Sequence, residues 1–150
     1  MHQRFSVDIE AEQEPIFHLV SDLATYHRWL DIVHQVEPAE GAADDPGPAW
    51  WVTLRARLGP LARSKRLRMV RVVHDEPTTA SFERREIDDR RHSAWVLTST
   101  VAPAATRGLS TVTMELSYDG GLWSPLLEGV LGSQVEEAGG NLQALATAER

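Results

Sequence analysis

The sequence contains no cysteine, so disulfides, thiolate nucleophiles and cysteine-based zinc or iron–sulfur sites are excluded. Its six histidines show neither HxH nor HExxH spacing, the patterns that bring two metal ligands to one strand or one helix face. The GxSxG, P-loop and GxGxxG motifs of serine hydrolases and nucleotide-binding enzymes are also missing. These absences predict a protein with no metal site and no cofactor.

Long apolar runs are lacking as well, since no stretch approaches the roughly 18 uninterrupted apolar residues of a membrane span. Acidic side chains outnumber Lys and Arg by 22 to 15, and the net charge of -7 argues against a general phosphate-binding surface. The first residues carry acidic groups in place of the apolar core of a secretory signal. We therefore expect one soluble, cytoplasmic domain over residues 1–150, with no nucleic-acid partner and no integral membrane segment.

The chain is predicted to begin with a strand and two short helices. Residues 4–11 alternate apolar and polar side chains, as expected for a half-buried strand. Residues 11–30 then carry apolar groups at helical spacing, and Pro15 suits a first helical turn. The polar pair Ser21 and Asp22 divides this segment into two helices.

Six further strands are predicted, because short alternating runs are separated by turns rich in proline, glycine and aspartate. They cover residues 31–38, 49–58, 62–73, 79–87, 93–102 and 109–119. Strict alternation fails between Met69 and Val73, which indicates a β-bulge. An amphipathic helix over residues 122–150 completes an α+β order, with a curved antiparallel sheet of about seven strands wrapped around that long C-terminal helix. A chamber is expected between helix and sheet.

Several residues resemble the opening pattern of the START-like, or SRPBCC, superfamily, the group of polyketide cyclase/dehydrase and lipid-transport proteins. The matching positions are Ala11, Phe17, Asp22, Tyr26 and Trp29. Residues 106–119 are similar to the family's penultimate element, and the resemblance covers essentially the whole chain. It implies the helix-grip fold, in which Tyr26 and Trp29 anchor the short helices as a lid over the chamber. Direct ligand contact is the alternative role for Trp29.

Strand alternation predicts which side chains line the chamber, because residues of one parity share one face of the sheet. Together with Trp29 of the lid and three residues of the final helix, they give the predicted ligand-binding residues, which are Trp29, Val52, Leu54, Met69, Phe82, Trp95, Val112, Met114, Leu116, Leu127, Leu131 and Val135. A plain hydrophobic core would use the same residues. The favoured function is binding or carriage of a hydrophobic small molecule, such as a lipid, a fatty acyl chain or a polyketide-like aromatic.

Glycines in the final helix favour a cavity. Gly129, Gly132, Gly139 and Gly140 each cost about 1 kcal/mol relative to alanine in a helix interior. A ligand groove, close approach of a strand, contact with a second subunit in a homodimer, or a kink at the glycine pair would account for them.

Residues 55–71 are rich in cations, and alternation sets a row of guanidinium groups on one face of two strands, namely Arg55, Arg57, Arg66 and Arg68. A solvated sheet face and a site for an anionic ligand both explain this row. A third hypothesis is a regulatory or toxin-like protein that docks an acidic partner through this basic face.

An enzyme of the cyclase or dehydratase type, without a metal, is the alternative function. The resemblance implies that aromatase/cyclase relatives polarise a polyketide carbonyl with a pocket arginine and hydroxyl groups. The candidates here are Arg66, Arg68 or Arg84 with Tyr118. In this hypothesis Arg66 or Arg68 stabilises an enolate and Tyr118 passes a proton.

Overall fold

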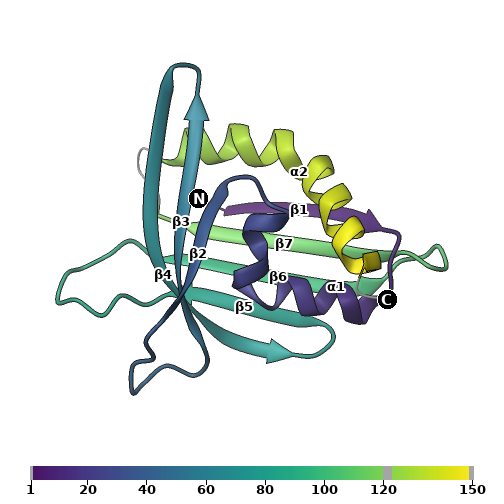
Figure 1. Ribbon diagram of the computed structural model, residues 1–150, viewed down its shortest axis with the longest axis horizontal. Coiled ribbons are helices and arrows are strands. Elements are labelled where there is room, and N and C mark those ends of the chain that lie inside the picture. Colours follow the sequence, from purple (N-terminus) through teal and green to yellow (C-terminus); the bar gives the residue numbers. More distant parts are fainter. Residues whose placement is uncertain (1, 120–122, 149–150) are drawn as a thin grey trace.

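The computed structural model describes residues 2–119 and 123–148, without the side chains of residues 58, 61, 123–127, 130 and 131. Its elements follow the predicted α+β order (Figure 1). They are β1 (His2–Ile9), α1 (Gln13–Val20), η1 (Leu23–Arg28), β2 (Val33–Ala39), β3 (Ala49–Leu58), β4 (Leu61–Asp75), β5 (Thr79–Arg84), β6 (Trp95–Pro103), β7 (Ser110–Tyr118) and α2 (Trp123–Ala148). None of the described helices has the length and apolar character needed to cross a bilayer.

The strands form one antiparallel sheet in the order β1-β7-β6-β5-β4-β3-β2. Strands β2 to β7 are neighbours in chain order, and β1 pairs with β7. Val7 lies opposite Val112 in that pair, so β1 and β7 present apolar residues on the same face. The predicted bulge is present as a register shift between Arg71 and Val73. Figure 1 shows β3 and β4 turned steeply away from β1 and β7, so that the sheet curves around α2.

Two short helices follow β1, as the sequence predicts. Helix α1 contacts α2 and β6, and the 3-10 helix η1 contacts β2 and β3. The Asp22 side chain accepts a hydrogen bond from the Ala24 N–H at 3.0 Å and so caps η1. Ile16 and Phe17 of α1 are fully buried. The helices thereby fix one side of the space between sheet and α2.

The glycines of α2 have different surroundings. A Cβ at Gly139 would lie 2.9 Å from Val7 Cγ2, closer than real Cβ atoms approach, so this glycine lets α2 pack against β1. At Gly129, Gly132 and Gly140 a Cβ would meet none of the described residues within 4 Å. Figure 1 also shows α2 changing direction partway along its length. Close approach of a strand therefore explains Gly139, and none of the described residues lies against the other three glycines.

Candidate functional site

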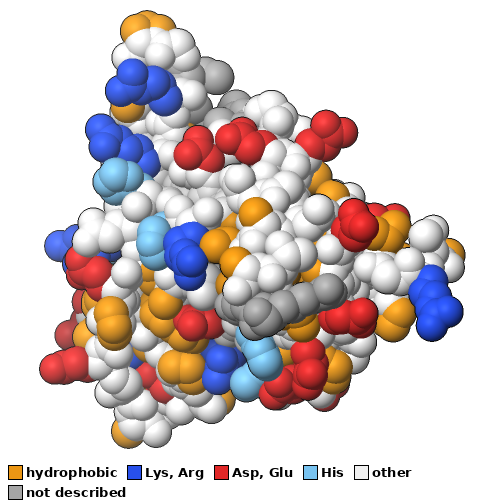
Figure 2. Space-filling model, turned by 45° about the vertical axis from the view of Figure 1, so that its right-hand side comes forward, with side chains coloured by type: hydrophobic (Ala, Val, Ile, Leu, Met, Phe, Trp, Pro, Cys, Tyr) orange, Lys and Arg blue, Asp and Glu red, His pale blue; other side chains and the backbone are white. Residues whose placement is uncertain are grey.

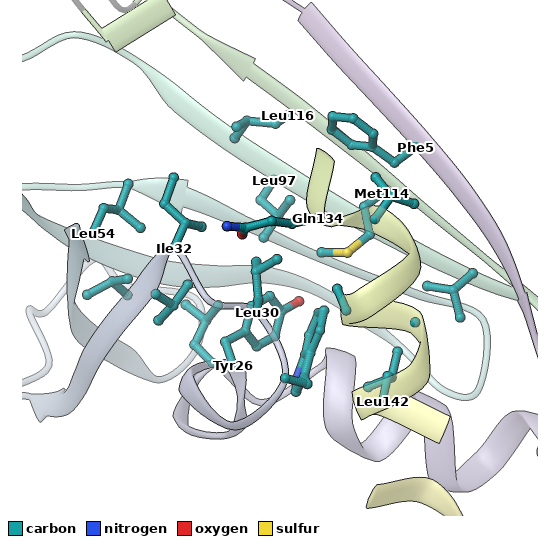
Figure 3. A pocket seen from close by; sticks show the side chains of 18 of the residues that line it. Phe5, Tyr26, Leu30, Ile32, Leu54, Leu97, Met114, Leu116, Gln134 and Leu142 are labelled. Atoms are coloured by element: carbon teal, nitrogen blue, oxygen red, sulfur yellow. The ribbon is translucent and has the colours of Figure 1, made fainter. Parts of the chain in front are cut away.

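A cavity of about 140 Å³ lies between the sheet, η1 and α2. Figure 3 shows side chains converging on it from both layers, with Gln134 extending from α2 into the space. The described residues that line it are Phe5, Val7, Leu23, Tyr26, Trp29, Leu30, Ile32, Val33, Val52, Leu54, Leu67, Met69, Trp95, Leu97, Val112, Met114, Leu116, Gln134, Val135, Ala138, Gly139 and Leu142. The wall is apolar almost throughout.

Most of the predicted ligand-binding residues lie on this wall. They are Trp29, Val52, Leu54, Met69, Trp95, Val112, Met114, Leu116 and Val135. Phe82 is different: it is fully buried, but it packs edge-on against Tyr26 and Trp50, with ring centroids 6.2 and 5.8 Å away. Phe82 therefore belongs to the core beside the cavity. Leu127 and Leu131 have side chains outside the described residues. A ligand contact by any of these side chains remains a prediction.

One stripe of α2 completes the wall and was not predicted in full. Its members are Gln134, Val135, Ala138, Gly139 and Leu142. Their spacing of one, three, one and three residues is the repeat of a single helix face. Gln134 was missed because it is polar, and Ala138 because it is small. Their helical spacing relative to Val135 and Leu142 could have identified both from the sequence.

The aromatic pair after α1 serves both as an anchor and as part of the wall. The rings of Tyr26 and Trp29 lie 4.5 Å apart, and both side chains are buried. The Tyr26 hydroxyl donates to the Val20 carbonyl at 2.6 Å and lies 3.3 Å from Ser99 Oγ on β6. Burial raises the pKa of Tyr26, so its hydroxyl stays a hydrogen-bond donor. The Trp29 indole N–H donates to Thr25 Oγ1 at 3.3 Å.

Two polar atoms on the cavity wall have no hydrogen-bond partner among the described residues. They are Nε1 of Trp95, a donor, and Oε1 of Gln134, an acceptor, and both are buried. Buried polar groups are normally paired, and an unpaired one costs about 1–3 kcal/mol. The described residues therefore leave the cost of burying these two atoms without compensation.

Arg68, one of the predicted catalytic arginines, does not line the cavity. It alternates with the wall residues Leu67 and Met69 and so points to the other face of the sheet. There its guanidinium donates to Asp45 Oδ2 at 2.7 Å and to the Glu40 carbonyl at 2.6 Å, under the loop between β2 and β3. The hydrogen bond from Arg68 lowers the pKa of Asp45. The pair is buried, and Arg68 links β4 to this loop on the face of the sheet away from the cavity.

Arg66 is also on the outer face and is exposed. Its guanidinium lies 4.4 Å from the centre of the Trp51 ring and 3.7 Å from Glu37. Arg55 and Arg57 are exposed too, and Figure 2 shows blue basic side chains gathered along the projecting β3–β4 hairpin at upper left. The predicted row of arginines is thus a solvated face, except for Arg68.

Arg84 and Tyr118 point to the cavity side of the sheet but do not line the cavity. Arg84 lies directly opposite Met69, and its guanidinium is bound by Glu86, Ser93 and His92 at 3.2–3.4 Å. Tyr118 is buried and stacks on Trp95 with ring centroids 5.1 Å apart.

The hydroxyl of Tyr118 accepts a hydrogen bond from Gln3 at 3.3 Å. The arginine–tyrosine pair of the cyclase hypothesis is therefore not assembled at the cavity wall. No group of three or more His, Asp or Glu side chains in the described part of the chain is arranged to hold a metal ion.

Solved structures of low sequence identity share this architecture. TTHA0849 from Thermus thermophilus superposes with a TM-score of 0.71 at 21% identity, over 99% of each chain. A START superfamily protein from Mycobacterium smegmatis gives a TM-score of 0.69 at 14% identity, also over 99% of each chain. The di-domain ARO/CYC protein BexL of the BE-7585A biosynthetic pathway gives a TM-score of 0.62 at 14% identity, over 97% of this chain and 50% of BexL. No curated protein matches the sequence.

These superpositions establish the helix-grip fold that the resemblance implied. The family of polyketide cyclase/dehydrase and lipid transport proteins matches residues 2–148, which is nearly the whole chain. The curved seven-stranded sheet, the long C-terminal helix and the cavity between them fit that match. The chain therefore belongs to the polyketide cyclase/dehydrase and lipid transport family.

Proposed function

We propose that the protein binds one small hydrophobic molecule in the cavity between the sheet and α2. The observation that carries this proposal is the cavity itself, whose wall is apolar and comes from β1, β2, β3, β4, β6, β7, η1 and α2. A ligand with an apolar body gains about 25 cal/mol for each Å² of its surface removed from water. The family name includes lipid transport, which agrees with an apolar ligand.

The volume of the cavity limits the size of the ligand. Its value of about 140 Å³ is close to that of an apolar cavity of roughly 150 Å³ that takes up benzene in another protein. Drug-sized ligands occupy larger pockets, typically about 300–1,000 Å³. We therefore expect a single ring with a short substituent, or a medium-length acyl chain.

Native mass spectrometry of the purified protein tests this proposal, followed by organic extraction and identification of any bound molecule. The matched variants are Ala138→Leu, which adds a side chain to the cavity wall, and Ala144→Leu, which makes the same change at an exposed position of α2. We expect one bound small molecule in the wild type and in Ala144→Leu, and none in Ala138→Leu. Empty wild-type protein that also fails to take up medium-chain fatty acids, their alcohols and single-ring aromatic compounds would contradict the proposal.

A further inference from the structure

Lys65 is the only lysine in the chain, alongside fourteen arginines, and it points to the cavity side of the sheet. It lies directly opposite Leu54 in the β3–β4 pair, and it shares its parity on β4 with Leu67 and Met69. Leu54, Leu67 and Met69 all line the cavity, and residues paired across antiparallel strands share a face. The Lys65 ammonium lies 5.8 Å from the centre of the Trp95 ring, which is also part of the wall.

The charge of Lys65 is not balanced by the described residues. Lys65 makes no ion pair or hydrogen bond with them, and its only close partner is the face of Trp95. Arg84 is near enough to repel it and is itself already bound to Glu86. Partial burial, followed by this repulsion, lowers the pKa of Lys65, and attraction to Glu86 only partly opposes the shift. An anion beside Lys65 would relieve both effects.

Beside Lys65, the indole N–H of Trp95 also needs a hydrogen-bond acceptor. Its side chain is 2% exposed, and its indole N–H has no acceptor among the described residues. A carboxylate only accepts hydrogen bonds and carries one negative charge. It would therefore satisfy a cation and an N–H donor at the Trp95 end of an apolar cavity. A phosphate carries more charge than the one uncommitted cation can balance, because the Arg84 guanidinium is already bound.

We propose that the ligand is a hydrophobic monocarboxylic acid whose carboxylate pairs with Lys65 beside Trp95 while its apolar body fills the cavity. This inference rests on the proposed function and narrows it to one chemical class of ligand. The acid group fixes the orientation of the bound molecule, since the rest of the wall is apolar except for Gln134.

Octanoic acid and 1-octanol form a matched pair of probes, because they differ only in the acid group. Binding is measured by isothermal titration calorimetry at neutral pH on the full-length protein and three variants. Lys65→Met removes the charge and keeps much of the side-chain length, and Lys65→Arg keeps the charge. Arg66→Met makes the same charge change at the adjacent residue on the opposite, exposed face.

We expect Lys65→Met to weaken octanoate binding by at least about tenfold, because a partly desolvated ion pair is lost. Binding of 1-octanol should be unchanged in every variant, and Arg66→Met and Lys65→Arg should retain octanoate binding. Equal octanoate affinity in the wild type and Lys65→Met overturns the inference and leaves the proposed function standing. Failure of the wild type to bind octanoate also overturns the inference, whereas the proposed function falls only if the wild type is empty as purified and takes up neither these probes nor single-ring aromatic compounds.

Amine labelling of the wild type provides a test that does not depend on a folded variant. Lys65 carries the only side-chain amine, and the N-terminal amine serves as an internal reference on the same molecule. Limited acetylation followed by peptide mass spectrometry should show that octanoate slows modification of Lys65 and leaves the N-terminal amine unaffected, whereas 1-octanol protects Lys65 much less. Equal protection by both probes contradicts a carboxylate contact.

Discussion

At the scale of single residues, Arg68 and Asp45 form the most deeply buried ion pair among the described residues, with side chains 1% and 4% exposed. Removing one partner leaves the other charge without compensation in a poorly solvated place. We expect Asp45→Asn to lower the free energy of unfolding by about 3 kcal/mol. Urea denaturation at neutral pH measures this loss. Asp44→Asn, an equal charge change at the exposed neighbour, is the control, and similar losses in both variants would argue against the pair.

The same pair predicts a dependence of stability on acid. Arg68 lowers the pKa of Asp45 from its ordinary value of 3.8. Because the folded pKa lies below the unfolded one, the ionised carboxylate stabilises the fold above about pH 4, and this contribution is lost as the pH falls through the folded value. Thermal unfolding should therefore show a steeper loss of stability below about pH 4 in the wild type than in Asp45→Asn. Parallel curves for the two proteins would be inconsistent with this coupling.

At the scale of elements, the packing of α2 against β1 depends on Gly139. Alanine gains about 1 kcal/mol over glycine inside a helix, and Gly140→Ala should gain this amount because its Cβ would meet none of the described residues. At Gly139 the added Cβ would lie 2.9 Å from Val7 Cγ2, and overpacking of this kind costs about 1–3 kcal/mol. We therefore expect Gly139→Ala to be less stable than Gly140→Ala.

Chemical denaturation of the two glycine variants measures the difference between them. The double variant Val7→Ala/Gly139→Ala tests the cause, because removing the Val7 methyl groups should reduce the penalty of the new Cβ. Additive effects of the two changes would show that the penalty does not come from this contact.

The elements also show what the sequence could predict. Val112, Met114 and Leu116 were placed on the chamber wall from alternation alone, because the pleat of one strand fixes the faces of its residues without reference to any partner. The same rule places Lys65 on the same face as Leu67. Lys65 was instead counted with the arginines around it as part of the cation-rich segment 55–71. Strand alternation alone is thus enough to predict which strand residues face the cavity. It must be applied to every residue of one parity, including polar residues such as Lys65.

The role of Arg68 could not be predicted in this way. Its partners are Asp45 and the Glu40 carbonyl, 23 and 28 residues away, on a loop with no helical or strand repeat. The position of such a loop depends on tertiary packing, so sequence spacing does not show that it covers the outer face of β4. Arg68 was therefore predicted as a candidate catalytic residue in the cavity, although strand alternation alone places its side chain on the outer face of the sheet.

At the scale of the whole molecule, the fold leaves an apolar cavity between the sheet and α2. At about 24 cal/mol per Å³, a cavity of about 140 Å³ corresponds to a loss of roughly 3 kcal/mol in the free energy of unfolding, relative to a filled core. Filling it should therefore stabilise the protein. We expect Ala138→Leu to raise the free energy of unfolding by about 1 kcal/mol, as cavity-filling changes commonly do.

The control for Ala138→Leu is Ala144→Leu, which should stay within about 0.5 kcal/mol of the wild type because position 144 is exposed. Urea denaturation of the three proteins decides between the outcomes. A loss of stability in Ala138→Leu alone would mean that the wall cannot accommodate the larger side chain.

A ligand that binds only the folded protein must stabilise the whole domain, because binding and folding are linked. At a free concentration of 100 times its Kd, octanoate should add about 2.7 kcal/mol to the free energy of unfolding. The urea midpoint should rise in proportion and the slope of the transition should stay the same, since the surface exposed on unfolding is unchanged. In Ala138→Leu the same octanoate concentration should give almost no shift, because the leucine occupies the space of the ligand. An equal shift in that variant would place octanoate outside the cavity, and stabilisation of the fold would then come from a different site.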